Sequence, residues 1–273
     1  MKRTRLAQAA LGAIGLIAVA ATSAGAASSG EVPTFQEYQQ QAFTDTDGQY
    51  VVNGDEALPN NGQLRQYYDR MTSTATDKGT TPTDGLIVNT VSGRDDKWSA
   101  SQALNLTYCV STKFGTSYST VVNAMSQGAG LWEGASSKVN FVYVPAQDGN
   151  CTTRNTSVLF SVEPTKTTQY IARAFFPSSP KSSRNILVNA SSLVSSGTWE
   201  PGDILGHELG HTLGFRHEHT RPEAGTCFED NNWRPLTPYD SVSIMHYPQC
   251  NGGSSDLEFS SGDVTGVRAL YGS

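Results

Sequence analysis

Three histidines and one glutamate stand at the spacing of a catalytic zinc site. The segment 207–217 reads H-E-x-x-H-x-x-G-x-x-H. On a helix, residues four apart share a face, so His207 and His211 can present their rings to one ion from successive turns. Glu208 is displaced to the side of that ion, where a carboxylate can act as a general base toward water. The pattern predicts a zinc endopeptidase.

A glycine turn is expected to supply the third ligand. Gly214 can adopt a positive φ at little cost, so the chain can leave the helix sharply and bring His217 round to the ion. Random placement would scatter the histidines, yet all five fall in one C-terminal region: His207, His211, His217, His219 and His246. Histidines that only cap helices or pack a core would not gather in this way. We therefore assign His207, His211 and His217 as ligands of a Zn²⁺ ion.

A methionine turn follows the histidines. Residues 243–247 read S-I-M-H-Y, and H-E-x-x-H-x-x-G-x-x-H followed by such a turn is the metzincin signature. The residue after the third histidine is Glu218, which resembles the astacin branch of the metzincins, as does the S-x-M-H-Y form of the turn. The chain is thus similar to small, secreted, bacterial-type metzincin peptidases related to astacins.

The resemblance implies roles for residues around the ion. It makes Tyr247 an additional zinc ligand that can also donate a hydrogen bond to the developing oxyanion. It places Met245 as an apolar floor beneath the metal. Glu218 would meet the new N-terminus made by activation, directly or through water; a solvated carboxylate at the helix exit is the alternative. Of the remaining histidines, we expect His219 at the surface or beside the ligands, and His246 in a structural role.

The N-terminus has the composition of a secretory signal peptide. Three basic residues within the first five precede an apolar, alanine-rich run from Leu6 to Ala21, and residues 24–26 form a small-residue cleavage site. The apolar run is too short to span a bilayer comfortably, and no later segment is apolar enough to do so. We expect residues 1–26 to be removed and the mature protein to be extracellular, with no membrane contact.

Charge and cysteine usage agree with export. The net charge is −6 and no basic patch exceeds a few residues, which argues against nucleic acid as a partner. Four cysteines in a secreted chain predict two disulfide bonds, for which three pairings exist. We favour Cys109–Cys151 and Cys227–Cys250, because the second pair would brace the loop leading into the methionine turn. Thiolate zinc ligands are the weaker interpretation, because no two cysteines have close C-x-x-C spacing.

The chain divides into three parts. After the signal peptide, residues 27–97 are polar and short of long apolar runs, and we interpret them as a pro-segment and linker. A flexible spacer without function is the alternative. Within this part, residues 35–43 and 63–71 have helix-like spacing. A catalytic domain, residues 98–273, is expected to begin near Trp98.

The catalytic part carries strand and helix patterns in a mixed order. Five segments resemble strands through alternation or β-branched and aromatic content: 104–110, 139–144, 157–162, 170–176 and 185–188. Residues 118–132 place apolar residues on one helical face, the histidine helix opens at 200–203 with an early proline, and a last helix is expected near 262–270. We predict an α+β fold: a metzincin-like zinc protease domain with a mixed, twisted sheet and two main helices above an irregular C-terminal subdomain.

One of these strands falls where metzincins keep the edge strand that lines the cleft. Residues 170–176 would then offer unpaired N–H and C=O groups, and an extended substrate could add there as a further strand. An ordinary internal strand is the alternative.

The resemblance also suggests how the precursor is kept inactive. A cysteine on the zinc is ruled out, because the first cysteine, Cys109, already lies in the predicted catalytic domain. Astacin pro-segments instead place an aspartate from an F-x-G-D element on the metal, and residues 52–55 read V-N-G-D. This similarity implies Asp55 as the blocking ligand, whereas a plain Asn-Gly turn is the alternative. Activating cleavage is expected between Thr72 and Trp98.

The predicted function is secreted, zinc-dependent hydrolysis of peptide bonds. A Zn²⁺-activated water would attack the bond with Glu208 as general base, in a monomer that acts on protein or peptide substrates. Two other functions stay open. A secreted zinc hydrolase of a non-peptide bond could use the same ligands, and a non-catalytic zinc-binding protein would have no need of Glu208. Nucleophile mechanisms lack a base, because no histidine lies outside the zinc region.

Overall fold

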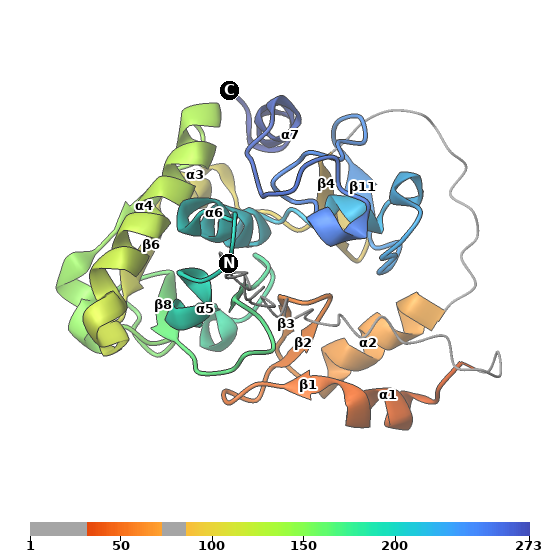
Figure 1. Ribbon diagram of the computed structural model, residues 1–273, viewed down its shortest axis with the longest axis horizontal. Helices are drawn as coiled ribbons and strands as arrows, with labels where there is room; N and C mark the ends of the chain where they lie inside the picture. Colours follow the sequence, from red (N-terminus) through yellow and green to blue (C-terminus); the bar gives the residue numbers. More distant parts are fainter. Residues whose placement is uncertain (1–31, 73–85) are drawn as a thin grey trace, which may run out of the picture.

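The computed structural model describes residues 32–72 and 86–273, so the signal peptide predicted at residues 1–26 lies outside the described residues. Within these ranges the chain forms seven α-helices and eleven strands in three sheets. Figure 1 shows the long helices α4 and α6 on one side and the N-terminal helices and strands grouped below and to the right. The mixture confirms the predicted α+β class.

The largest sheet has five strands in the order β7-β6-β8-β10-β9. Its strands are β6 (Leu106–Val110), β7 (Phe141–Tyr143), β8 (Phe160–Pro164), β9 (Ala172–Arg173) and β10 (Asn185–Val188). The first three and β10 run parallel, whereas β9 is antiparallel to β10 and forms the edge. β8 starts later than predicted, because the Asn155 side chain accepts a hydrogen bond from Ser157 N–H and holds that stretch in a turn.

Two helices pack tightly against each other beside this sheet. α4 (Tyr118–Ala135) and α6 (Pro201–Thr212) meet at Gly128 and Gly206, where an added Cβ on Gly128 would collide with the facing backbone. The Trp132 indole N–H, on α4, donates to the Gly206 carbonyl at 2.8 Å. The close approach fixes the position of the histidine helix relative to the sheet.

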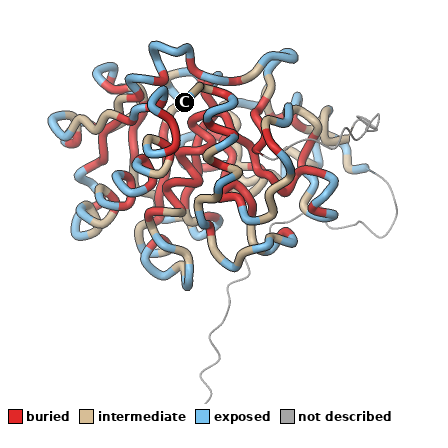
Figure 2. Tube along the Cα trace, turned by 90° about the horizontal axis from the view of Figure 1, so that it is seen from above, coloured by how far each residue is buried: buried red, intermediate tan, exposed pale blue. Residues whose placement is uncertain are grey.

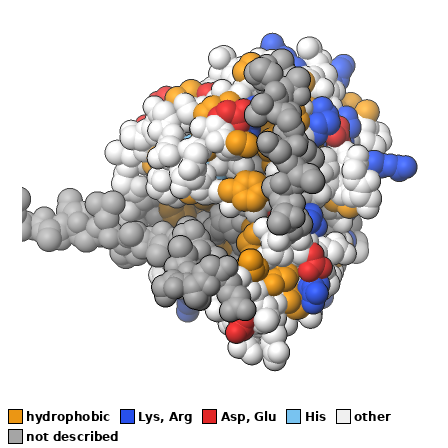
Figure 3. All heavy atoms as spheres, turned by 90° about the vertical axis from the view of Figure 1, so that its right-hand side faces the viewer, with side chains coloured by type: hydrophobic (Ala, Val, Ile, Leu, Met, Phe, Trp, Pro, Cys, Tyr) orange, Lys and Arg blue, Asp and Glu red, His pale blue; other side chains and the backbone are white. Residues whose placement is uncertain are grey.

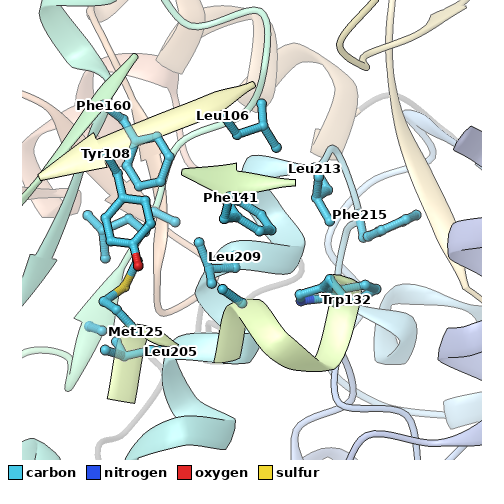
Figure 4. Close-up of a cluster of buried hydrophobic side chains, with 14 of the residues drawn as sticks. Leu106, Tyr108, Met125, Trp132, Phe141, Phe160, Leu205, Leu209, Leu213 and Phe215 are labelled. Carbon is cyan, nitrogen blue, oxygen red and sulfur yellow. The ribbon is translucent and has the colours of Figure 1, made fainter. Parts of the chain in front are cut away.

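The main hydrophobic core fills the space between the helices and the sheet. Buried residues form the centre of the tube in Figure 2, and Figure 4 shows the side chains that meet there. Trp132 stacks on Phe215 with ring centroids 5.1 Å apart, and Tyr108 stacks on Phe160 at 5.5 Å. The α7 helix (Ser261–Tyr271), close to its predicted position, contributes Val267 to the same core.

Residues 32–72 form a separate small unit. It comprises α1 (Phe35–Gln41), β1 (Phe43–Thr44), β2 (Tyr50–Val52), β3 (Glu56–Leu58) and α2 (Asn61–Thr72). The strands make an antiparallel sheet in the order β1-β2-β3, and the buried side chains of Val52, Leu64 and Tyr67 form a core of their own. Both helices expected here are confirmed, whereas the sheet was not predicted.

A third sheet joins distant parts of the chain. β4 (Ile87–Val91) lies between β5 (Arg94–Asp95) and β11 (Trp233–Pro235), and both pairings are antiparallel. The segment 87–95 therefore packs with the C-terminal part. Two short helices, α3 (Ala100–Ala103) and α5 (Ala190–Leu193), complete the α-helical content of the described residues.

The C-terminal part is irregular, as predicted. Beyond α6 the chain makes short 3₁₀ turns at 218–220, 222–224 and 248–250 before it enters α7. Disulfide bonds join Cys109 to Cys151 and Cys227 to Cys250, which confirms the favoured pairing.

The last two features of the fold are the mixture of side chains on one face and the character of the helices. On the face drawn in Figure 3, acidic and basic side chains of the described residues are interspersed with apolar ones. Across residues 32–72 and 86–273, no helix has both the length and the apolar character that crossing a membrane requires.

Candidate metal centre

The helix α6 brings two histidines to one point. It starts with Pro201 at its first position and Asp203 in its first turn, both favourable at the positive end of a helix. His207 and His211 follow on the buried face, one turn apart, with ring centroids separated by 4.9 Å. The predicted pair therefore faces a common position inside the protein.

A glycine turn adds the third histidine. Gly214 has φ of 100°, and a Cβ at this position would collide with the carbonyl oxygen of Asp96. Only glycine fits both the backbone angle and the space. The turn brings the Nε2 atom of His217 to 3.2 Å from that of His207.

Each of the three rings is oriented by its other nitrogen. The Nδ1 atoms lie within hydrogen-bond distance of three oxygens: Ile244 O for His207 at 2.7 Å, Phe215 O for His211 at 2.8 Å, and Glu229 Oε1 for His217 at 2.6 Å. An Nδ1–H that donates to such an oxygen leaves the lone pair on Nε2. All three Nε2 lone pairs are thus available at one point, which is the arrangement of metal-binding imidazoles.

A carboxylate from the N-terminal unit completes the cluster. Asp55 Oδ2 lies 3.0 Å from His207 Nε2, and Asp55 Oδ1 lies 3.2 Å from His217 Nε2 and 3.4 Å from His211 Nε2. Two ligands of a tetrahedral zinc ion are themselves roughly 3.3 Å apart, so these spacings fit the ion. Asp55 Oδ1 and His211 Nε2 are buried without hydrogen-bond partners, as expected of atoms that face a cation.

Tyr247 lies against the same cluster. Its hydroxyl donates to Asp55 Oδ2, and its ring stacks on His207 at a centroid distance of 5.3 Å. Gly54 has φ of 99°, and a Cβ there would lie only 3.3 Å from the Tyr247 hydroxyl. The Asn53-Gly54 turn and the approach of Asp55 to the histidines therefore occur together, although they were predicted as alternatives.

Glu208 is buried beside the cluster. Its Oε2 atom has no hydrogen-bond partner. Burial raises the pKa of the Glu208 carboxyl well above its usual range, and the Asp55 carboxylate adds to the rise. An unpartnered carboxyl with a raised pKa can accept a proton from water and hold it.

Two residues that sequence reasoning missed support the centre. Glu229 orients His217, and Asp263 on α7 accepts hydrogen bonds from the Ser243 hydroxyl and from Ile244 N–H, the latter at 2.9 Å. Asp263 thereby fixes the methionine turn, whose Ile244 carbonyl holds His207. Ser260 and Asp263 form a capping box, and its S-x-x-D pattern was visible in the sequence. No sequence pattern pointed to Glu229, because it lies 12 residues from its partner, His217.

Comparison with known proteins identifies the chain. Residues 86–271, more than half of its length, match the family described as dual-action HEIGH metallo-peptidases. The chain belongs to this family. Its own form of the five-residue motif is H-E-L-G-H at 207–211. The metzincin assignment is thereby confirmed at the level of the family.

Curated relatives share shorter segments with this metallopeptidase. The zinc metalloproteinase nas-30 of Caenorhabditis elegans is 38% identical over 77 residues, which cover 21% of the chain and 10% of the relative. Human Tolloid-like protein 1 is 35% identical over 91 residues, which cover 25% and 9%. Zinc metalloproteinase nas-39 of Caenorhabditis elegans is 30% identical over 107 residues, which cover 25% and 12%. The matches thus span about a tenth of each relative's length.

The remaining predicted residues of the metallopeptidase lie around the centre. Met245 is fully buried and packs against Gly210 of α6, beneath the histidines. Glu218 is also fully buried, which contradicts the solvated alternative: its Oε1 accepts from Asp240 N–H at 3.1 Å and its Oε2 has no hydrogen-bond partner. His219 was expected at the surface or beside the ligands, and it takes the second of these positions, buried beside His217. His246 pairs with the Tyr239 hydroxyl at 2.8 Å.

Proposed function

We propose that this metallopeptidase is a secreted, astacin-like endopeptidase that is made as a latent precursor. The observation that carries the proposal is the convergence of three imidazole Nε2 atoms beside the buried carboxyl of Glu208. The signal sequence at residues 1–26 and the two disulfide bonds support export.

His207, His211 and His217 would hold the zinc ion, with Tyr247 as a further ligand. When bound, zinc polarises the scissile carbonyl and lowers the pKa of water. Glu208 takes the proton of the attacking water and passes it to the leaving amine. The Tyr247 hydroxyl donates a hydrogen bond to the oxyanion that develops on the substrate.

In the precursor, we infer that Asp55 keeps the centre inactive. Its carboxylate lies among the three histidine Nε2 atoms and accepts the Tyr247 hydroxyl hydrogen bond. Asp55 would therefore have two effects. It occupies the position that water needs, and it engages the Tyr247 hydroxyl, which is the oxyanion donor.

The pro-segment would leave after a cut that follows Thr72. The cleavage region expected between Thr72 and Trp98 includes residues 73–85, which lie outside the described residues. Because β4 pairs with β11, we propose that the catalytic domain keeps Ile87 onwards, rather than beginning near Trp98. The family match from residue 86 supports this boundary.

The same departure would open the substrate path. Ala174, which follows the edge strand β9, accepts from Ala57 N–H at 3.1 Å and donates to Asp55 O at 3.0 Å. These main-chain groups become free when the pro-segment leaves, so an extended peptide could pair with them as an added strand. Glu218 would then be available to meet the new N-terminus, because its Oε2 lacks a partner.

The deciding experiment replaces the base and keeps the ligands. Glu208→Gln in the full chain, activated by limited proteolysis, should bind one equivalent of zinc by metal analysis. Its peptide hydrolysis should fall roughly 10²–10⁴-fold or more, because proton transfer by a positioned base contributes that much. The matched control is Glu223→Gln, whose half-exposed carboxylate lies on a surface turn. Near-normal turnover by zinc-loaded Glu208→Gln protein would refute the mechanism.

A further inference from the structure

Arg173 on the edge strand β9 has an unusual set of partners. Its side chain is fully buried, with Nε 2.9 Å from Asp45 Oδ2 and Nη2 2.6 Å from Asp47 Oδ2. Both carboxylates belong to the N-terminal unit, at the turn between β1 and β2 (Figure 1). Among the described residues, no carboxylate of the part from Leu86 onwards forms an ion pair with Arg173.

A second buried arginine shows the contrast. Arg216 also contacts the pro-segment, at Glu56, but it keeps two carboxylates from the catalytic part: Glu229 at 2.8 Å and Asp230 at 2.5 Å. After loss of the pro-segment, the charge of Arg216 would still be paired with Glu229 and Asp230. The same loss would leave Arg173 without either of its ion-pair partners, which is costly for a buried charge; the Glu208 carboxylate interacts with it electrostatically but forms no ion pair with it.

The catalytic part surrounds these two carboxylates with donors. The Tyr170 hydroxyl donates to Asp45 Oδ2, and Asn185 Nδ2 donates to Asp47 Oδ2 at 3.0 Å. The Asn185 Oδ1 atom accepts from Arg173 Nη1 at 3.0 Å and so holds the guanidinium in place. Tyr170, Arg173 and Asn185 together bind these carboxylates, and all three residues belong to the part of the chain that would remain after the pro-segment leaves.

The site also lies beside the path of an extended chain. Arg173 directly precedes Ala174, whose main chain pairs with Asp55, and Asp55 reaches the histidine cluster. A peptide that replaces the pro-segment along β9 would therefore pass both the metal centre and the guanidinium. A planar guanidinium matches a carboxylate geometrically, with two parallel N–H donors.

We propose that Arg173, with Tyr170 and Asn185, is a subsite of the active enzyme for an acidic side chain of the peptide substrate. Asp45 and Asp47 then stand in for that substrate carboxylate in the precursor. The proposal rests on the proposed function, because it requires the pro-segment to leave and a peptide to take its place.

The first test is a cleavage profile of the activated, zinc-loaded enzyme made from the full chain. Peptide pairs that differ only by Asp against Asn, or Glu against Gln, are scanned along the substrate. At one position the acidic peptide should have a kcat/KM roughly tenfold or more above its amide partner, the scale of a hydrogen-bonded charge. Arg173→Gln should bring this ratio to about one, and Arg173→Lys should keep part of it. Arg234→Gln, at an exposed pair with Asp95, should leave the ratio unchanged.

A binding measurement tests the acidic subsite without relying on turnover or on the Arg173 variants. Activated, zinc-loaded Glu208→Gln protein is titrated with the fluorescein-labelled acidic peptide and with its amide partner, and anisotropy gives both Kd values. Tighter binding of the acidic peptide supports the subsite even if no hydrolysis is seen, an outcome that would sink only the proposed function. Equal kcat/KM values and equal Kd values for the acidic and amide peptides at every position would overturn the subsite.

Discussion

The three histidines of the centre are held by two kinds of partner. His207 and His211 contact backbone carbonyls, whereas His217 contacts a carboxylate, Glu229. Glu229 is itself bound to Arg216 at 2.8 Å and is buried. A charged partner makes an imidazole more basic and therefore a stronger ligand than a carbonyl does. His217 should thus depend on its partner's charge more than the other two do.

The charge on Glu229 can be removed with little change in shape. Glu229→Gln in the activated enzyme should weaken zinc binding about 10–100-fold, the usual effect of losing such a partner. Competition with a chromophoric chelator measures the zinc Kd. Glu223→Gln should bind zinc as the unchanged enzyme does, because its side chain is 44% exposed. An unaltered zinc Kd for Glu229→Gln would show that the carboxylate only fills space.

The elements around the centre differ in how far the sequence predicted them. The helices α4, α6 and α7 were expected near their observed positions, because each carries a regular apolar face or a start signal over ten residues or more. Gly214 was predicted as the turn, since no other residue type leaves a helix so sharply. Local patterns were sufficient wherever one element positions the side chain.

Pairings across long distances were not predictable in this way. The strands β1 and β5 have only two residues each, which is too short for an alternating pattern to appear. β4 joins β11 from more than 130 positions away along the chain. The role of Glu229 arises only when separate segments meet, and the S-x-x-D pattern at Asp263 indicated a helix start but not the contact with the methionine turn.

The contact of α7 with the methionine turn predicts a pH effect on stability. Burial raises the pKa of Asp263 from 3.8 to about 6. A raised carboxyl pKa means that the folded state binds the extra proton, so this contribution to stability is complete below pH 4 and is lost as pH rises through 6. Over this range the loss is roughly 3 kcal/mol, from one shift of about two pKa units at 1.36 kcal/mol per unit.

A comparison of variants isolates this effect from other titrating groups. Asp263→Asn cannot ionise, so its deficit in unfolding free energy relative to the original protein should be largest near pH 4 and should shrink by roughly 3 kcal/mol near pH 7. Urea unfolding of both full chains at several pH values measures the difference. Asp256→Asn, near the surface before α7, serves as the control. A deficit that grows with pH would contradict the assignment.

In the whole molecule, four acidic side chains of the N-terminal unit contact the catalytic part. Asp45 and Asp47 bind Arg173, Glu56 lies 3.4 Å from Arg216, and Asp55 lies among the histidines. Of these contacts, only that of Asp55 would block the metal directly. Latency and docking of the pro-segment should therefore be separable by mutation.

Asp55→Ala tests this separation. The uncut precursor should show activity that is absent from the unchanged precursor, because the histidines and Tyr247 lose the carboxylate while the other acidic contacts keep the pro-segment attached. Hydrolysis of a short fluorogenic peptide, with gel analysis to prove that the chain is intact, provides the measurement. Asp69→Ala, at an exposed i,i+4 pair on α2, should stay latent. Equal latency of the Asp55→Ala and unchanged precursors would exclude Asp55 as the blocking ligand.

The two hydrophobic cores share no described side chain, since every buried member of the main one comes from Leu86 or later. The N-terminal unit can therefore change its interior over evolution without repacking the rest of the protein, and the reverse also holds. Mutual constraint falls on the polar contacts between the two parts, such as Asp45 with Arg173 and Tyr170, and Arg70 with Asp230. Homologous chains should accordingly diverge quickly across residues 32–72 while covariation concentrates at pairs such as Asp45 with Arg173.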